Sequence, residues 1–299
     1  MKDIVFNTLT TPYAEEMDKA SPWNIYPRPQ LKRDSFFSLN GEWDFSVSEN
    51  DEIPCAFNEK ILVPFPPESL LSGIERKMPE NGYMVYKKNF SLPENFIKDS
   101  VILHFGAVDQ CCIAFLNQKC IGKNEGGYLP FSFNITDYIV NGENELILIV
   151  RDPLDKKYPY GKQTKKRGGM WYTPVSGIWQ TVWIESLPKH PILSIKIDQT
   201  SKNAKITVNS EAEYKKLTLK ESGTVYEFTE DEIIITPDNP KCWTPENPYL
   251  YEFTLETKTD KIESYFALRE VDIRVFNEIP RICLNGKPLL MNGDRKSVV

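Results

Sequence analysis

Alternating apolar and polar residues dominate this chain, and the pattern is strongest in Gly168–Glu185, which holds three of the six tryptophans. The last residues of this stretch alternate as a β-strand does. One face carries Ile178, Val182 and Ile184, and the other carries Trp179, Thr181 and Trp183. Because a strand at a sheet surface has one polar face, apolar bulk on both faces indicates that both are covered. We expect the core of its own domain to cover one face and other domains to cover Trp179 and Trp183.

Short strands separated by turn residues account for residues 36–187. The clearest alternating or continuous apolar runs are 41–47, 83–90, 101–105, 112–116, 131–135 and 146–150. The last run is apolar on both faces and predicts a fully buried strand. Almost no segment repeats apolar residues with the period of a helix, so the pattern predicts an all-β fold that begins with a jelly-roll β-sandwich at 36–187. Four prolines punctuate residues 1–35, which we interpret as an extended N-terminal arm.

A second β pattern follows the linker Leu187-Pro188. Alternation recurs at 193–197, 204–208, 251–255 and 271–275. These short strands fit an immunoglobulin-like β-sandwich at 188–278, although the paired cysteines of antibody domains are absent. An Asn-Gly turn within Ile282–Met291 predicts a hairpin, and residues 279–299 are interpreted as the opening of a further domain.

One long polar segment interrupts the strand rhythm. Residues 151–170 (RDPLDKKYPYGKQTKKRGGM) are longer than ordinary connections between strands. Loops of this length are usually functional or disordered, which makes this segment the best candidate for a binding site.

Composition and charge exclude several classes of protein. No apolar run approaches the length of a membrane span, and the N-terminus lacks the pattern of a secretory signal, so we expect no membrane association. The net charge of −6 disfavours nucleic acid as a partner. Six cysteines without C-x-x-C spacing indicate packed thiols in a reducing, cytoplasmic environment.

Candidate catalytic and metal-binding residues are few. His104 lies in an apolar strand and His190 in the linker, so no metal site is predicted. No G-x-S-x-G elbow occurs, and no helix follows Gly126-Gly127 to bind a phosphate. The acidic run 230–232 is interpreted as a solvated turn. No catalytic residue and no cofactor is therefore assigned.

Several motifs in order resemble glycoside hydrolase family 2, which includes β-galactosidases, β-glucuronidases and β-mannosidases. In the first domain they are LNGEWDF (39–45), FGAVD (105–109), GGYLPF (126–131), NITD (134–137) and GIWQTVWIE (177–185). In the second domain they are WTPENPYL (243–250), FALR (266–269) and LNGKPLLMN (284–292). The resemblance covers nearly all of the chain from about residue 35. One departure is Gln118, which stands where the family usually has glycine in an Asn-Gly-Lys turn.

The resemblance implies a jelly-roll sugar-binding domain, an immunoglobulin-like domain and then a catalytic (β/α)8 barrel. A barrel needs about 250 residues, so residues 279–299 are expected to hold only the start of a truncated one. The two catalytic glutamates of the family belong to the barrel and have no counterpart here. The resemblance also implies hydrolysis of a terminal β-linked sugar by the parent enzyme.

In the family, the loop equivalent to 151–169 reaches toward the sugar pocket of the barrel. The sugar-binding candidates in this region are Asp152, Asp155, Lys162, Gln163, Trp171 and Tyr172. The two aspartates would accept hydrogen bonds from sugar hydroxyls, Lys162 and Gln163 would donate them, and the aromatic rings would stack on a pyranose. A purely structural interpretation also stands: Asp152 caps a turn before Pro153, and the lysines are solvated.

Three functions remain open at this point. The favoured one is a non-catalytic N-terminal portion of a family 2 glycosidase that binds a β-linked glycoside and supports the missing barrel. A free-standing carbohydrate-binding module would instead use exposed aromatics. A structural or interaction protein would use an exposed strand face, and a homo-oligomer is then a possible assembly.

Overall fold

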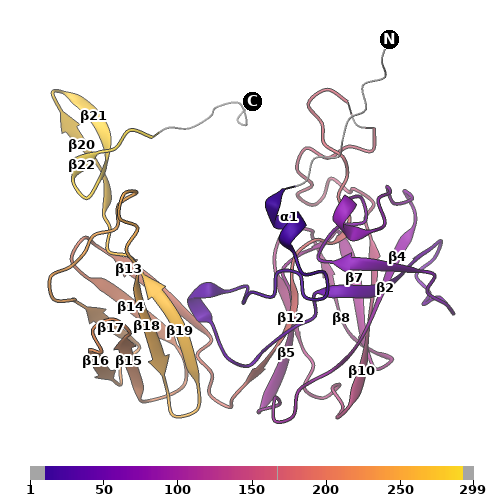
Figure 1. Cartoon of the computed structure of the whole chain (residues 1–299), viewed down its shortest axis with the longest axis horizontal. Coiled ribbons are helices and arrows are strands. Elements are labelled where there is room, and N and C mark those ends of the chain that lie inside the picture. Colours follow the sequence, from indigo (N-terminus) through magenta and orange to yellow (C-terminus); the bar gives the residue numbers. More distant parts are fainter. Residues whose placement is uncertain (1–10, 167, 292–299) are drawn as a thin grey trace. The chain divides into compact units, whose positions relative to one another are not determined.

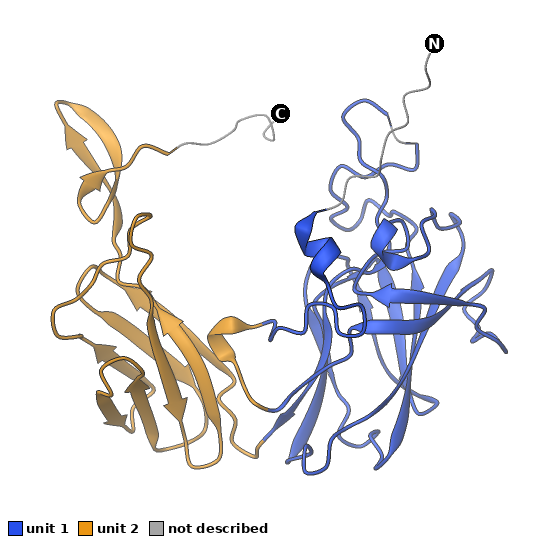
Figure 2. Ribbon diagram, in the orientation of Figure 1, with its two compact units in different colours: residues 1–27, 35–187 blue, residues 28–34, 188–299 orange. Residues whose placement is uncertain are grey.

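The computed structural model describes residues 11–166 and 168–291, which form two compact units (Figures 1 and 2). Unit 1 comprises residues 1–27 and 35–187, and unit 2 comprises residues 28–34 and 188–299. The chain therefore passes between the units three times. The regular secondary structure of both units is almost entirely β-strand, which confirms the all-β prediction. Within the described ranges, no helix has the length and apolar character needed to cross a membrane.

Unit 1 is a sandwich of two antiparallel sheets. The four-stranded sheet has the order β1 (Phe36–Ser38), β12 (Val182–Leu187), β5 (Ser100–Phe105), β9 (Phe131–Asn134). The six-stranded sheet has the order β3 (Glu59–Val63), β2 (Gly41–Ser48), β4 (Tyr83–Ser91), β10 (Glu143–Arg151), β7 (Cys111–Leu116), β8 (Lys119–Glu125). A short pair, β6 (Val108–Asp109) and β11 (Gly177–Ile178), completes the unit. Every predicted strand run in this unit is present.

The core of unit 1 lies between the two sheets, where alternate side chains of each strand meet. Strand β10 is buried on both faces, as its continuous apolar run predicts. Its inner residues, such as Leu148, join the main core. On the outer face, Ile147 and Ile149 pack with Val85 of β4 and are flanked by Phe57 and Phe115. This second apolar layer explains why β10 lacks a polar face.

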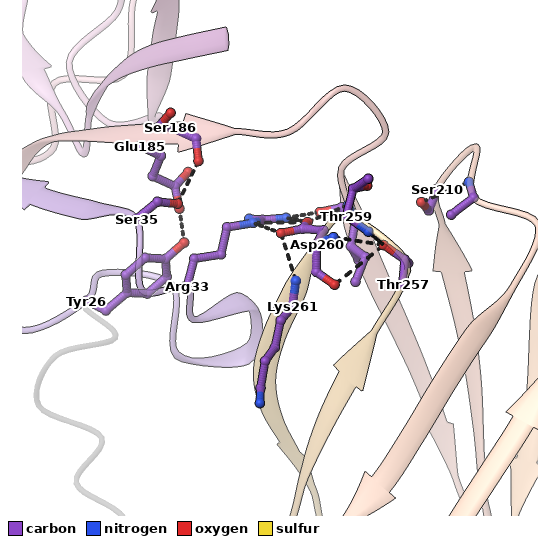
Figure 3. Close-up of polar contacts among 12 residues, drawn as sticks. Tyr26, Arg33, Ser35, Glu185, Ser186, Ser210, Thr257, Thr259, Asp260 and Lys261 are labelled. Atoms are coloured by element: carbon purple, nitrogen blue, oxygen red, sulfur yellow. Dashed lines mark hydrogen bonds and ion pairs between the residues drawn. The ribbon is translucent and has the colours of Figure 1, made fainter. Parts of the chain in front are cut away.

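The tryptophan-rich strand is covered mainly by its own unit. Trp183 is 3% exposed and stacks on His104 of β5 with 4.8 Å between ring centroids, so the expected cover from another domain is not needed there. Trp179 is half-buried. His104 Nε2 also lies 2.9 Å from Glu185 Oε2, and the hydroxyl of Tyr26 donates to the same carboxylate (Figure 3).

Unit 2 contains two facing sheets with a shared apolar core. One has the order β13 (Ser194–Gln199), β14 (Ala204–Asn209), β17 (Glu232–Ile235), and the other has the order β16 (Val225–Phe228), β15 (Lys215–Leu219), β18 (Tyr251–Glu256), β19 (Lys261–Phe266). Strands β15, β16, β17 and β19 were missed by the sequence pattern. The N-terminal segment 28–34, with the 3-10 turn Pro29–Leu31, also belongs to this unit and contributes Leu31 to its core.

A separate antiparallel sheet follows the second sandwich. It consists of β20 (Val271–Phe276), β21 (Ile279–Leu284) and β22 (Lys287–Pro288). The alternation of Val271, Ile273 and Val275 predicts a sandwich strand, but β20 pairs with β21, and all three side chains are exposed. The hairpin predicted within 282–291 is present as β21 and β22. The polar tail 292–299 lies outside the described residues.

The segment 28–34 is fixed to unit 2 by a buried ion pair (Figure 3). Arg33 Nη2 donates to Asp260 Oδ2 at 2.9 Å, and the two side chains are 3% and 1% exposed. The same guanidinium donates to the carbonyl of Ile192, and the Ile192 amide donates to Asp260 Oδ2 at 2.8 Å. The carboxylate and the guanidinium therefore satisfy each other where water cannot reach them.

Replacing Arg33 with methionine should lower the free energy of unfolding of unit 2 by about 3 kcal/mol, because Asp260 would be buried without its partner. Urea unfolding followed through Trp243, the one tryptophan of unit 2, measures this loss. Lys261→Met is the matched control, since the Lys261–Glu256 pair is largely exposed and should contribute under about 1 kcal/mol. Equal losses in the two variants would contradict the role given to Arg33.

Candidate functional site

The long segment between β10 and β11 is anchored at its base by a buried glutamine. Gln110 is fully buried, and its side-chain amide makes two hydrogen bonds to the backbone of Asp155. Gln110 Nε2 donates to the Asp155 carbonyl at 3.1 Å, and the Asp155 amide donates to Gln110 Oε1 at 3.0 Å. This paired contact fixes the first turn of the loop against the end of β6.

Gln163 makes the second anchor from inside the loop. It is 8% exposed, and its Oε1 accepts from the Val175 amide at 2.6 Å. Its Nε2 donates to the Tyr128 hydroxyl at 3.1 Å and to Asp109 Oδ2 at 3.5 Å. One amide side chain thus connects the middle of the loop, its end, and the chain before β9.

Three acidic side chains lie near these anchors. Glu68 accepts hydrogen bonds from the Ser176 hydroxyl at 2.6 Å and from the Ser176 amide at 3.1 Å. Asp109 is 3% exposed and bonds Gln163. Asp152 accepts from the Leu154 amide at 2.8 Å. The three come from distant parts of the sequence and are brought together by the ends of β6 and β10 and the start of β11.

The environment of these carboxyl groups favours their protonated form. Burial raises the pKa of Asp109 to about 7, and the neighbouring charge of Asp152 acts in the same direction. Burial also raises the pKa of Glu68, against the hydrogen bonds from Ser176, and raises the pKa of Asp152. Groups with raised pKa values that share a site are candidates for proton transfer or for hydrogen bonding to hydroxyl-rich ligands.

Exposed aromatic and apolar side chains surround the anchored loop. Trp171 is 46% and Tyr172 is 63% exposed, and Met170, Tyr128 and Leu129 are exposed as well. Tyr128 packs edge-on against Trp179 with ring centroids 5.8 Å apart, and Trp179 Nε1 donates to the Gly127 carbonyl at 2.8 Å. Large rings that stay in water on a fixed loop are the usual platforms for sugar stacking.

Some of the predicted site residues make hydrogen bonds within the protein, and others are exposed to solvent. Asp152 caps the turn at Leu154, as the structural interpretation expects, and the Asp155 carboxylate bonds the amide of Lys157 at 3.0 Å. Gln163 points inward to Asp109 and Tyr128, so in this conformation it supports the loop. Trp171 and Tyr172 are exposed, and Lys162 is half-buried, with its carbonyl accepting from the Tyr172 amide at 2.8 Å.

Sequence reasoning missed Glu68, Asp109, Gln110 and Tyr128. Asp109 and Tyr128 lie within the motifs FGAVD and GGYLPF. These motifs could have indicated that both residues belong to the site. Glu68 follows a proline run without any pattern of its own. Its contact with Ser176 spans 108 residues and depends on tertiary folding. Among the described residues, no group of three or more His, Cys, Asp or Glu side chains has an arrangement that could hold a metal ion.

Comparison with known families identifies the two units. Residues 72–188 match the family model "Glycosyl hydrolases family 2, sugar binding domain", and residues 179–269 match "Glycosyl hydrolases family 2". The two matches follow each other along the chain and together cover residues 72–269. The chain belongs to glycosyl hydrolase family 2, and it carries the sugar-binding domain and the domain that follows it.

Relatives of known sequence agree with this assignment. The chain is 25% identical over 231 residues to a β-galactosidase of Thermoanaerobacter pseudethanolicus, covering 70% of this chain and 31% of the relative. It is 24% identical over 253 residues to a β-glucuronidase of Formosa agariphila, covering 71% of this chain and 26% of the relative. The chain thus spans about a third of the length of these curated relatives.

Solved structures share the fold. A β-glucuronidase from Ruminococcus gnavus, in complex with D-glucuronic acid, superposes with a TM-score of 0.69 at 20% identity, over 88% of this chain and 50% of that one. A Faecalibacterium prausnitzii β-glucuronidase gives a TM-score of 0.66 at 21% identity, over 89% and 50%. These likenesses show the β-sandwich fold of the two units.

The raised pKa of Asp109 makes the stability of unit 1 depend on pH. The folded unit keeps a proton near pH 7 that an unfolded Asp109, with its ordinary pKa of 3.8, would release. The resulting stabilisation is complete below about pH 4 and is lost as the pH rises toward 7, by at most about 1.4 kcal/mol per pH unit. Asp109→Asn, which stays uncharged, should flatten this dependence.

Urea unfolding of the parent chain and of Asp109→Asn at pH 5 and pH 8 measures the effect. Glu68 and Asp152 titrate in both proteins, so the difference between the two profiles reports Asp109 together with its coupling to these two carboxyl groups. Parallel profiles would show that Asp109 ionises normally in the folded unit.

Replacing Gln163 with alanine should loosen the end of the loop, because the Val175 amide loses its acceptor and Asp109 loses its donor. We expect hydrogen exchange at the Val175 amide to become about tenfold faster or more. Exchange measured by NMR reports this amide directly. Gln180→Ala, at an exposed position, is the matched control and should leave Val175 unchanged. Unchanged exchange in Gln163→Ala would contradict the anchoring role.

Proposed function

We propose that this chain supplies the sugar-binding and supporting domains of a family 2 β-glycosidase whose hydrolysis of a terminal β-linked sugar takes place in a (β/α)8 barrel. The observation that carries this proposal is the anchored loop, which holds Trp171 and Tyr172 in solvent and is bonded through Gln163 to the buried Asp109. A loop fixed by Gln110 and Gln163 is rigid enough to form one wall of a sugar pocket. The names of the relatives, β-galactosidase and β-glucuronidase, support the substrate class.

The exposed hairpin is the proposed contact with the barrel. Val271, Ile273 and Val275 of β20 are each about two-thirds exposed or more, and Ile279 of β21 and Leu290 are exposed too. An apolar strand pair of this size is unusual in contact with water and indicates a partner surface. The family resemblance implies a barrel after the second domain, which supports the barrel as the occupant we propose.

A free-standing carbohydrate-binding module is the second candidate function. The exposed rings of Trp171 and Tyr172 favour it, because they would stack on a sugar without any barrel. In that case the chain alone would bind glycans at millimolar concentration or better, and Trp171→Ala would abolish the binding. Under the first proposal the loop alone binds more weakly than this, since the remaining walls of the pocket belong to the barrel.

The remaining parts of the proposal concern the architecture of each unit, the cellular location and self-association. We propose the jelly-roll arrangement for unit 1 and the immunoglobulin-like arrangement for unit 2. A cytoplasmic location stays a prediction that rests on the free cysteines. Self-association through the exposed hairpin of β20 and β21 is a further prediction, and light scattering at several concentrations tests it.

The chain by itself should not hydrolyse aryl β-galactosides or aryl β-glucuronides, because the family's catalytic glutamates belong to the barrel. Release of p-nitrophenol by the purified chain, compared with buffer, is the measurement. Turnover above the rate in buffer would contradict the proposal that catalysis takes place in the barrel. Loss of that turnover in Glu68→Gln or Asp109→Asn would then assign catalysis to the carboxyl groups beneath the loop.

A further inference from the structure

Unit 2 contains a cavity of about 470 Å³ that lies entirely within its own residues. It opens at one end of the sheet β16-β15-β18-β19, between the turn that joins β15 to β16 and the segment that joins β17 to β18. Its volume is within the range of small-molecule sites. The residues that matter here are Glu221, Tyr226, Asp238, Lys241, Tyr249 and Tyr251.

Three tyrosines give the cavity a rigid aromatic wall. Tyr251 is 7% exposed and belongs to the core of unit 2, and Tyr226 and Tyr249 pack against that core. Tyr249 meets Tyr251 edge-on with ring centroids 4.8 Å apart. The Tyr251 hydroxyl accepts from the Lys241 amide at 2.7 Å, which ties the β17–β18 segment to the wall. Rings fixed in this way lose little freedom when a ligand packs on them.

Polar groups at the mouth are also held in place. Lys241 Nζ lies 3.0 Å from Glu221 Oε1 and 4.4 Å from the centroid of the Tyr249 ring. Burial, with the charge of Asp238 second, raises the pKa of Tyr226, which keeps its hydroxyl protonated as a donor. The cavity therefore offers fixed donors and acceptors beside an aromatic face.

The charged side chains that line the cavity limit the class of ligand that it can bind. Glu221 is paired with Lys241, and Glu252 lies 3.7 Å from Lys220, which also pairs with Glu263 at 3.1 Å, so the three acidic side chains of the cavity are only partly compensated. In the described part of the chain, Asp238 is left without an ion-pair partner. Such a site disfavours anions, and the Asp238 carboxylate is left to accept hydrogen bonds from the hydroxyls of a ligand.

We propose that this cavity binds a neutral sugar unit of a glycan. The apolar face of the ring would pack on Tyr226, and sugar hydroxyls would donate to Asp238 and accept from Lys241. Aromatic faces combined with carboxylate acceptors and an ammonium donor suit a ligand that is apolar on one face and hydroxylated at its edge. The proposal depends only on side chains of unit 2.

Titration of the full chain with lactose and cellobiose, followed by calorimetry and by NMR shifts, tests the proposal. Binding at millimolar concentration is expected. Affinity should fall about tenfold or more in Tyr226→Ala. Asp238→Asn, at an exposed position where the fold is not at risk, should weaken binding in the same direction. Tyr214→Ala is the matched control, since Tyr214 is exposed on the same unit outside the cavity.

Several outcomes would overturn the assignment. These are no binding of either disaccharide, equal affinity in the parent chain, Tyr226→Ala and Asp238→Asn, or tighter binding of glucuronic acid or choline than of the neutral sugars. Trp171→Ala separates this site from the loop of unit 1. Retained affinity in that variant supports the cavity, whereas loss of binding would place the sugar on the loop instead.

Discussion

Burial of β10 on both faces is the constraint on which unit 1 depends. A strand with apolar side chains at every position from Leu146 to Val150 has to sit between β4 and β7 and beneath a second apolar layer around Val85. Its end at Arg151 is therefore fixed, and the long loop starts from a rigid point. The buried amides of Gln110 and Gln163 then hold a polar segment in place without any helix or strand of its own.

The strand pattern allowed most of unit 1 to be predicted, because inward and outward residues alternate cleanly there, as in β5. The pattern failed for β15, β16 and β17, whose four or five residues are too few for a recognisable period, and it also missed the longer strands β8 and β19. It also misplaced β20, because alternation shows that one face of a strand is apolar but says nothing of what covers that face. For β20 the apolar residues face solvent.

Only part of the site could be predicted in the same way. The length and composition of 151–170 marked the loop, and the aromatic residues Trp171 and Tyr172 are exposed as expected. The carboxyl groups beneath the loop were not found, because Glu68 and Ser176 meet across 108 residues and nothing local records that contact. Gln163, whose residue type suggested a ligand donor, makes its hydrogen bonds within the protein, and its contact with a sugar stays a prediction.

The passage of residues 28–34 into unit 2 has a consequence for how the protein is made. The segment leaves the ribosome before the rest of unit 2, because the carboxylate that receives Arg33 is more than two hundred residues later, at Asp260. Unit 1 is therefore synthesised in full before the strands of unit 2 against which this segment packs. For the same reason, cutting the chain at the single boundary after Leu187 would not separate two intact domains, since the second fragment would lack Leu31 and Arg33.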